Sequence, residues 1–355
     1  MHTPLALYYR RLATRGPKNI ADRLLLAVLI PIGILYGCIN FIRAKLYQWG
    51  VFSRYISSVP VVSVGNLAVG GTGKTPLVDY LIKQQQLNQR KVAVISRGYG
   101  GKNTDSVRVV CAGHGPLLSA KDCGDEPYLL AQRNPETIVI VAPKRSAGID
   151  YAAKKFKVDL ILLDDAFQHL AVERNLNLLL FDSRYPVGNG HLLPAGLLRE
   201  FTSAQKRADL CISTRYDEQT AVPFICEQPL VKAQQRLAST ACDLSGATYS
   251  LEQLRNGKCV AFAGIASPDD FFTSLRELGI TLQSTLPLAD HCEFTSQRIE
   301  EIKKLSADAD YLLTTEKDAV KLNANLFDIP CCSFPLVFEP LESDLLNQKI
   351  ESLFH

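Results

Sequence analysis

The stretch VPVVSVGNLAVGGTGKTPLVDYL, residues 59–81, decides which fold we expect. An apolar strand leads into a glycine-rich turn, and Lys74 and Thr75 then begin an amphipathic helix, which is the order of a phosphate-binding P-loop. Glycines let the backbone N–H groups of such a turn face phosphate oxygens, and the helix N-terminus favours their charge. Ala68 stands where the usual pattern has its first glycine, and a small residue is tolerable there. The residues expected to bind the nucleotide are Gly70, Gly71, Thr72, Gly73, Lys74 and Thr75.

A site of this kind needs a carboxylate that handles Mg²⁺ at the end of a neighbouring strand. The string LILLDD, residues 160–165, supplies it, because Asp164 and Asp165 follow an apolar run. In an open α/β sheet this is the edge at which ligands bind. We expect Lys74 to reach the β- and γ-phosphates, and Thr75 and the two aspartates to hold Mg²⁺. A helix-capping pair is the alternative interpretation of the aspartates.

The chain lacks the marks of two classes of P-loop switch. A GTPase needs N/T-K-x-D for guanine, whereas TTEKD, residues 314–318, has no residue between its lysine and its aspartate. Partition-type ATPases carry a lysine before the two glycines, where this chain has Val69. Neither switch class is supported, although the loop and the acidic strand together predict ATP or GTP binding.

An uncharged apolar segment, from Leu24 to Ile42, precedes the P-loop. At about 1.5 Å per residue, a helix of this length approaches the roughly 30 Å of a bilayer core. Basic residues flank it, and the only Trp follows within an aromatic cluster at residues 47–55, as at a membrane–water interface. We predict a retained membrane anchor, with a buried core helix as the alternative. Pro31 and Gly33 leave open whether it spans the bilayer or lies kinked in one leaflet.

Composition limits the remaining possibilities. A length of 355 residues suggests two domains, and 47% hydrophobic with 21% charged residues predicts a packed core. With 39 basic and 36 acidic residues the net charge is only +3, so we expect no nucleic-acid partner, and nothing marks an obligate protein partner. The 10 cysteines and 6 histidines show no zinc-ligand spacing, and we interpret the cysteines as reduced, mostly buried thiols of a cytosolic domain.

Short apolar strands alternate with helices through most of the chain, which predicts a parallel sheet covered on both faces. The strands are expected at residues 61–64, 92–96, 138–141, 160–164, 176–181 and 210–213. After a polar, irregular stretch at 214–256, a second unit is expected with strands at 259–263 and 311–314, helices at 268–278 and 296–305, and a last apolar stretch at 332–338. Ser267 and Asp270 would cap the first of these helices.

The predicted fold class is α/β, with a P-loop NTPase-like parallel sheet domain, a smaller α/β domain and an N-terminal membrane-associated helix. We expect a membrane anchor at residues 1–50, a P-loop kinase core at 51–225, and a smaller domain at 226–355 that closes the cleft.

Several strings in order along the chain resemble those of the lipid A 4′-kinases (tetraacyldisaccharide 4′-kinases). They are GNLAVGGTGKTP (65–76), SRGYGG (96–101), GDEPYL (124–129), LDDAFQH (163–169), LLPAGLLRE (192–200), FAGIASP (262–268), ADHCEFT (289–295) and TTEKDAVK (314–321). The resemblance implies an inner-membrane enzyme of Gram-negative bacteria with its catalytic domains on the cytoplasmic side. It implies transfer of the γ-phosphate of ATP, with Mg²⁺, to the 4′-hydroxyl of a tetraacylated glucosamine disaccharide 1-phosphate, giving lipid IVA in lipid A biosynthesis.

The resemblance also assigns roles outside the P-loop. Asp125 matches the proposed general base for the sugar hydroxyl, and His291 matches the histidine paired with it; a carboxylate can accept the proton as the hydroxyl attacks. Arg199 matches an arginine beside the transferring phosphoryl group, and Glu200 a member of the Mg²⁺ shell. An ordinary surface ion pair is the alternative for these last two. Two arginines are further candidates for phosphate contacts: Arg97 and Arg145.

Two other functions stay open on the residues themselves. A different membrane-associated P-loop kinase would act on another lipid or sugar headgroup. A membrane-tethered nucleotide switch would need Lys74 and Asp165 but not Asp125.

Overall fold

Parallel strands form the centre of the larger of two sheets. In the computed structural model, which describes residues 4–99, 101, 106–224, 226–290 and 292–354, β1 (Val61–Asn66) pairs in parallel with β5 (Leu160–Asp164) and β6 (Leu176–Asp182). The order is β15-β8-β7-β6-β1-β5-β2-β4-β3, and the two edge strands run antiparallel to their neighbours. The remaining strands of this sheet are β2 (Val92–Ser96), β3 (Arg108–Ala112), β4 (Ile138–Val141), β7 (Leu210–Thr214), β8 (Leu230–Leu237) and β15 (Leu336–Pro340).

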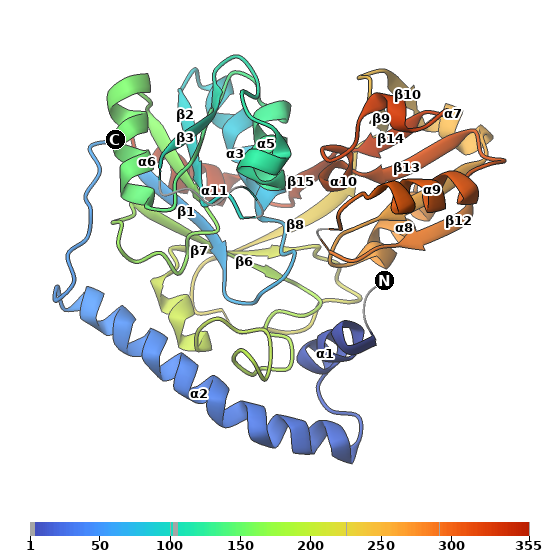
Figure 1. Ribbon diagram of the computed structural model, residues 1–355. Helices are drawn as coiled ribbons and strands as arrows, with labels where there is room; N and C mark the ends of the chain where they lie inside the picture. The colour runs from blue at the N-terminus through green and yellow to red at the C-terminus, as the bar shows by residue number, and fades with distance from the viewer. Residues whose placement is uncertain (1–3, 100, 102–105, 225, 291, 355) are drawn as a thin grey trace.

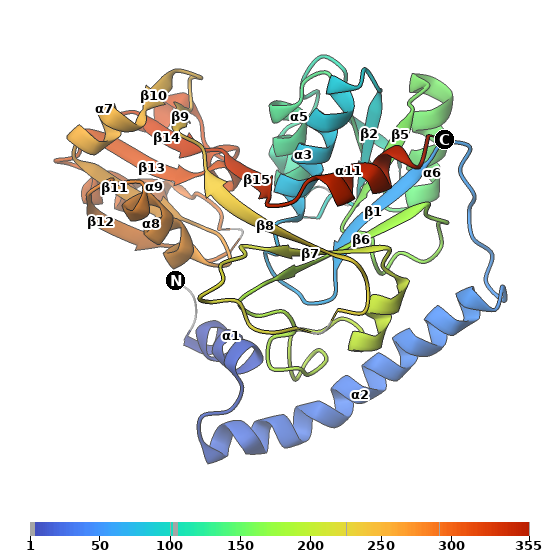
Figure 2. The ribbon, with the colours of Figure 1, turned by 180° about the vertical axis from the view of Figure 1, so that it is seen from behind.

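Helices cover both faces of this sheet (Figures 1 and 2). On one face α3 (Lys74–Leu87), α5 (Asp125–Arg133) and α11 (Asp344–Glu351) share an apolar core with the strands. On the other face α6 (Arg145–Tyr151) and the π-helical turn η1 (Ala152–Phe156) pack against β2, β4 and β5. α3 follows β1 and α5 leads into β4, so the N-termini of both helices lie at the carboxyl edge of the sheet. Two short helices complete this unit: α4 (Ala120–Cys123) and the 3-10 helix η2 (Thr202–Arg207).

A second, smaller sheet has the order β10-β9-β14-β13-β11-β12, with a parallel centre as expected for an α/β unit. Its strands are β9 (Thr240–Asp243), β10 (Thr248–Ser250), β11 (Cys259–Ala263), β12 (Leu282–Pro287), β13 (Tyr311–Thr315) and β14 (Cys331–Phe334). Its helices are α7 (Leu251–Asn256), α8 (Pro268–Glu277), α9 (Ser296–Leu305), α10 (Glu316–Ala319) and the 3-10 helix η3 (Ala324–Leu326). α8 and α9 contribute apolar side chains to separate cores of this sheet.

The stretch at 214–256 is more regular than expected, and this prediction is wrong in part. β8, β9, β10 and α7 all fall within it. β8 buries only Val231 and Ala233, its middle is otherwise polar, and its ladder is formed with β7 and β15. A strand stabilised mainly by its neighbours leaves a weak pattern in the sequence.

β8 and β15 form an antiparallel ribbon that joins the two units (Figure 2). β8 leads into the smaller sheet, and β15 leads back out of it to α11, which packs on the larger core. The expected division at residue 226 placed β8, β15 and α11 with the smaller unit, whereas both strands belong to the larger sheet.

Two helices precede the sheet: α1 (Pro4–Arg15) and α2 (Ile20–Gln48), which runs along the base of the larger unit (Figure 1). α2 continues through Pro31. Its middle packs on the core, because a Cβ at Gly37 would lie 2.6 Å from Leu192 Cδ1. Within the described residues, α2 is the one helix long and apolar enough to cross a membrane. Large apolar side chains remain exposed along it: Ile20, Leu24, Val28, Ile32, Leu35, Ile39 and Ile42.

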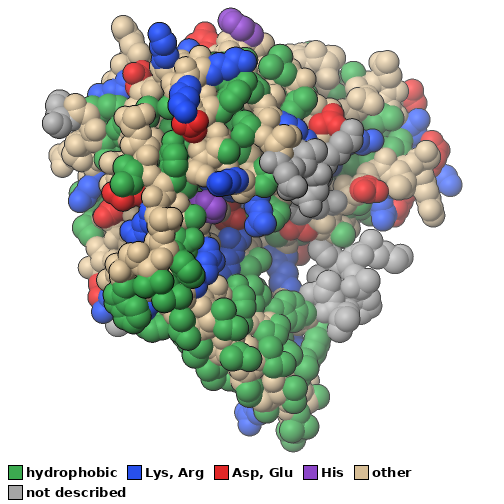
Figure 3. Space-filling model, turned by 60° about the vertical axis from the view of Figure 1, so that its left-hand side comes forward, with side chains coloured by type: hydrophobic (Ala, Val, Ile, Leu, Met, Phe, Trp, Pro, Cys, Tyr) green, Lys and Arg blue, Asp and Glu red, His purple; other side chains and the backbone are tan. Residues whose placement is uncertain are grey.

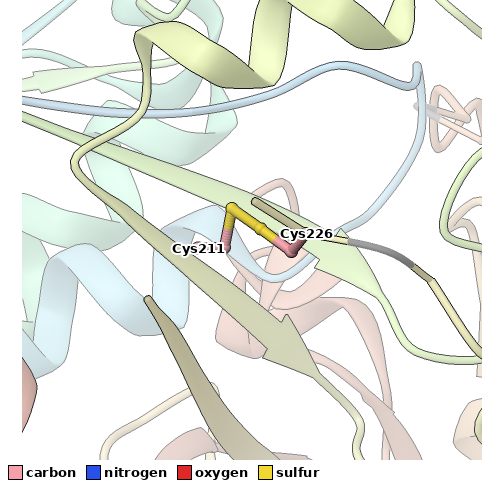
Figure 4. The surroundings of a disulfide bond; sticks show 2 residues. All are labelled: Cys211 and Cys226. Atoms are coloured by element: carbon pink, nitrogen blue, oxygen red, sulfur yellow. A yellow bond between two sulfur atoms is a disulfide. The ribbon is translucent and has the colours of Figure 1, made fainter. Parts of the chain in front are cut away.

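Cys211 in β7 and Cys226 in the segment before β8 form a disulfide (Figure 4). The expectation of reduced thiols is wrong for this pair. The bond depends on how the segment before β8 folds back onto β7, which residue spacing does not reveal. Most of the other cysteines are buried thiols, as expected. Burial raises the pKa of Cys123 and of Cys259 to about 11.

Candidate active site

The phosphate loop is shaped by the last residue of β1. Asn66 Nδ2 donates to the carbonyl of Ala68 (2.7 Å) and to Thr72 Oγ1 (3.0 Å), which ties both halves of the turn together. Gly73 precedes α3 with φ +82°, a left-handed conformation that side chains with a Cβ rarely adopt. Ala68 is buried and bridges to Leu198, so it is accommodated where a glycine is usual. The loop therefore has the form that the sequence predicted.

Asp164 and Asp165 end β5 beside the loop, but their environments differ. Asp165 lies 3.4 Å from Lys74 Nζ, and both its oxygens accept from Arg199 Nη1 at 3.1 Å. Burial alone would raise the pKa of Asp165, yet these two cations lower it. Asp164 is fully buried; burial first, then the charges of Glu126 and Asp165, raise its pKa to about 7. Adjacent carboxylates held so differently are typical of functional sites.

The carboxylates suit a divalent cation. Both side-chain oxygens of Asp164 are buried without a hydrogen-bond partner, and such groups are stable only when a cation or water compensates them. Thr75, the predicted hydroxyl ligand, is buried in the first turn of α3. Glu200 faces elsewhere, because both of its oxygens accept from Arg207 at 2.8 and 2.9 Å. Among the described residues no group of three or more His, Cys, Asp or Glu is placed to hold a metal.

Asp125 and its neighbour Glu126 begin α5 and face the smaller unit. Lys321 Nζ lies 3.0 Å from Asp125 Oδ2, and Lys317 Nζ donates to Glu126 Oε1. The charge of Lys317 lowers the pKa of Glu126. The predicted partner of Asp125, His291, lies outside the described residues. The structure thus joins the predicted base to lysines of the string TTEKDAVK.

A second contact joins the units at α8. Arg184, which follows β6, donates to Asp182 and also to both oxygens of Asp270 at 3.2 and 2.9 Å. The hydroxyl of Ser267 accepts from Arg10 of α1 and makes no capping bond. The expectation that Ser267 and Asp270 cap α8 is therefore wrong for their side chains, which bind residues outside the helix.

The two candidate phosphate arginines lie differently. Arg145 is buried; Nη2 donates to the carbonyl of Asp164 (3.3 Å) and Nη1 to that of Ala142 (3.0 Å). Burial lowers the pKa of Arg145 to about 10. Arg97 is exposed and donates to the hydroxyl of Tyr99 at 2.8 Å. Arg97 can therefore reach a ligand, whereas Arg145 supports the end of β5 from within.

His169 lies within a group of basic side chains. Burial first, and then the positive charges around it, lower its pKa to about 4. These charges belong to Arg145, Arg174, Arg43 and Arg97. In Figure 3, Lys and Arg side chains line the hollow above the apolar side chains at the base of the molecule. Basic side chains therefore surround His169.

Four residues at the site were not predicted as functional: Asn66, Glu126, Lys317 and Lys321. Each lies inside a string quoted above, and the acidic pair at 125–126 and the lysines four residues apart were visible in the sequence. Their pairing was not visible, because it joins segments that lie far apart in the chain.

A family model described as tetraacyldisaccharide-1-P 4′-kinase matches residues 25–355. The tetraacyldisaccharide 4′-kinase of Syntrophotalea carbinolica is 46% identical and covers 99% of this chain and 98% of its own. That of Geobacter sulfurreducens is 39% identical and covers 98% of each chain. The crystal structure of "apo" form LpxK from Aquifex aeolicus in complex with ATP has a TM-score of 0.80 and 30% identity, covering 93% of this chain and 100% of its own.

These similarities extend over almost the whole chain, through the phosphate loop, the acidic strand and the smaller unit. They confirm the resemblance, the fold class and the ATP-dependent kinase function that the motifs predicted. The chain belongs to the tetraacyldisaccharide 4′-kinase family.

Proposed function

We propose that this chain transfers the γ-phosphate of ATP to the 4′-hydroxyl of a tetraacylated glucosamine disaccharide 1-phosphate at the inner membrane, giving lipid IVA. The observation that carries the proposal is a cleft with two chemically distinct sides. One side is a P-loop beside the buried Asp164 and the partly buried Asp165, and the other is a carboxylate, Asp125, that faces the smaller unit.

The larger unit binds and activates the nucleotide. Backbone N–H groups of residues 70–73 and the amino group of Lys74 bind the phosphates. Arg199 holds Asp165 and offers positive charge to the transferring phosphoryl group. Thr75, Asp164 and Asp165 would hold Mg²⁺, which supplies charge neutralisation on the phosphate oxygens when bound. Glu200 supports the site through Arg207 rather than as a direct ligand.

Asp125 accepts the proton of the sugar hydroxyl. Its Oδ2 lies 3.0 Å from Lys321 Nζ, so the carboxylate stands beside a cation of the smaller unit. His291 pairs with this carboxylate. Because the proton leaves as the hydroxyl attacks the γ-phosphate in line, positioning supplies most of the rate enhancement. Arg97 and Arg145 favour binding of the substrate's 1-phosphate, the first directly and the second through the charge of the cleft. The smaller unit closes over the cleft and excludes water.

α2 holds the enzyme at the cytoplasmic surface of the membrane. Its exposed apolar side chains suit the acyl region, while its middle packs against Leu192 and Phe201 of the larger unit. A helix in contact with the globular unit at its centre cannot be surrounded by lipid there, so we infer that it lies in one leaflet. This position presents the cleft to a headgroup whose chains stay in the bilayer, since exposing them would cost about 0.8 kcal/mol per CH₂.

The test is a phosphate-transfer assay in mixed micelles with labelled ATP, Mg²⁺ and the tetraacyldisaccharide 1-phosphate. Wild type is expected to form a 4′-phosphorylated product, and Asp125→Asn to lose at least about 100-fold in kcat, the usual contribution of a general base. Asp150→Asn, which removes an exposed carboxylate on α6, is the matched control and is expected to match wild type. No transfer by a protein that binds ATP would contradict the proposed acceptor. An active Asp125→Asn would instead favour a different base.

A further inference from the structure

The turn that follows the acidic end of β5 is held by an arginine from the next segment of the chain. Asp165 begins this turn with φ +48°, a left-handed conformation that side chains with a Cβ rarely adopt. Arg174 Nη1 donates to three carbonyl oxygens of the turn, those of Ala166 (3.3 Å), Phe167 (3.4 Å) and His169 (3.2 Å). One guanidinium nitrogen thus links three carbonyls, and a strained backbone persists only where such contacts hold it.

The segment that carries Arg174 is fixed on both sides of it. The backbone N–H of Glu173 donates to the carbonyl of Tyr55, and that of Asn175 donates to the carbonyl of Val61, each at 2.9 Å. Asn175 Oδ1 also accepts from the N–H of Val61 (2.9 Å), which joins the segment to the start of β1. Burial lowers the pKa of the Arg174 side chain to about 10, so it stays protonated at neutral pH and donates from a fixed position.

Two side chains of the turn contact groups of the nucleotide site. Gln168 Nε2 donates to the carbonyl of Asn66, the residue that leads into the phosphate loop, at 2.9 Å, and Gln168 Oε1 accepts from Arg199 Nη1 at 3.4 Å. The same Arg199 nitrogen donates to both oxygens of Asp165 at 3.1 Å. A displacement of the turn would therefore move the Asp165 carboxylate and Arg199 together, relative to the phosphate loop.

We propose that Arg174 is a positioning residue for the site that binds Mg²⁺ and ATP, and that it acts by holding the turn at residues 165–169 against the end of β1. This inference rests on the proposed function, in which Asp165 is a ligand of Mg²⁺ and Arg199 offers charge to the transferring phosphoryl group. Arg174 acts through backbone carbonyls and does not itself contact the reactants. Residues that hold a metal ligand from outside typically change metal affinity or activity by about 10–100-fold when they are replaced.

The test is calorimetric binding of ATP, once with Mg²⁺ and once with EDTA, to Arg174→Met, Arg174→Lys and Arg255→Met of the full chain. Arg174→Met is expected to weaken binding with Mg²⁺ by about 10–100-fold and to leave binding in EDTA near the wild-type value, since the phosphate loop is intact. Arg174→Lys should recover part of the loss, because all three bonds come from one nitrogen and an ammonium group has three donors. Arg255→Met is the matched control, because it removes an exposed arginine that also donates to a carbonyl, that of Leu278.

Turnover in mixed micelles adds a second measurement. Arg174→Met should need more Mg²⁺ for its half-maximal rate and should keep the KM for the acceptor, because the turn lies on the nucleotide side of the cleft. An equal loss of ATP binding with Mg²⁺ and with EDTA would overturn the inference, since it indicates a general disturbance of the fold. Wild-type binding in Arg174→Met, or no recovery in Arg174→Lys, would overturn it as well.

Two further checks keep the outcomes distinct. Thermal unfolding shows whether each variant folds, and Arg174→Gln replaces Arg174→Met if the latter does not. Calorimetry with ATP needs no lipid. A wild-type protein that binds ATP with Mg²⁺ but transfers no phosphate therefore contradicts the proposed acceptor, while the comparison of the Arg174 variants still decides the positioning role.

Discussion

The two sides of the cleft are built by different means. On the larger side, Lys74 and Asp165 have only 11% and 15% of their side chains exposed, and they stand where α3 begins and β5 ends. Across the cleft, the ion pairs exist only where two units meet: Lys321 and Asp125 are each 15% exposed, and Lys317 and Glu126 are 32% and 31% exposed. The nucleotide side is therefore preformed by one sheet, whereas the acceptor side is completed by docking.

This difference separates two functions that a kinase must combine. Charges fixed by a packed sheet bind phosphate without reorganisation, which favours electrostatic stabilisation of the transition state. In the proposed mechanism, charges brought together by docking are present only in the closed form, so the base is positioned when water is excluded. Changes on the two sides should therefore have different effects on ATP use and on turnover.

The largest effect is expected at the preformed side. Lys74→Met removes a cation aimed at the phosphates, and kcat/KM for ATP should fall by about 1000-fold, the upper range for one such donor. Lys83→Met, on the same helix but in a half-exposed pair with Asp79, is the control and should change little. Steady-state kinetics with varied ATP measures both. If kcat/KM for ATP falls less in Lys74→Met than in Lys317→Met, the nucleotide side is not the one on which ATP use mainly depends.

The preformed side also depends on α2. Gly37→Leu places a side chain where Leu192 and Phe201 now lie, with contacts at 2.6 and 2.8 Å already for a Cβ. Since overpacking of this kind typically costs about 1–3 kcal/mol, the free energy of unfolding should fall by that amount and the midpoint of thermal unfolding should fall with it. Activity should fall because Asn40 of α2 donates to the carbonyl of Arg199. Cys38→Leu, at an exposed position of the same helix, should keep both stability and activity. If Gly37→Leu and Cys38→Leu change stability and activity equally, the packing of Gly37 against the larger unit does not contribute to either.

Salt should act mainly on the docked side. At about 0.1 M the screening length is about 10 Å, so partly exposed pairs weaken with added NaCl more than buried ones do. We expect kcat to fall a few-fold between low and high salt, with a smaller change in the dissociation constant for ATP, measured by calorimetry. Lys317→Met should lower kcat at low salt and reduce its salt sensitivity, since it removes the most exposed of these ion pairs. A salt effect confined to ATP binding would contradict docking by ion pairs.

The smallest effect is expected from His169. Its pKa is lowered from 6.5 to about 4 by burial and by the surrounding arginines, so the imidazole is neutral in the folded protein. Its contribution to stability is present above pH 6.5 and is lost as the pH falls through about 4. His169→Gln should therefore reduce the acid-induced fall in the free energy of unfolding over this range, measured by denaturant titration at several pH values. Identical pH profiles for both proteins would show that the histidine is not held neutral.

The elements with local signals could be predicted from the amino-acid sequence. The P-loop, the buried strands and the acidic end of β5 follow from glycine placement, runs of Val, Ile and Leu, and chain order, and the structure has them within a residue or two of the expected positions. α2 could be predicted in the same way, because it contains a long uncharged apolar segment. The family strings placed Asp125 and Arg199 in the cleft, although the contacts of Glu200 were not foreseen.

Which residues contact one another across the molecule depends on the folded arrangement of the two sheets. No periodicity or spacing encodes the contacts of β8 with β15, of Asp270 with Arg184 or of Lys321 with Asp125, which join segments far apart in the chain. The pairing of Cys211 with Cys226, 15 residues apart, was not encoded by spacing either. The different environments of Asp164 and Asp165 have the same origin, because burial and neighbouring charge belong to the folded site and not to the dipeptide. Local sequence fixes the backbone and its phosphate loop, whereas long-range packing sets the charges that make the loop part of a kinase.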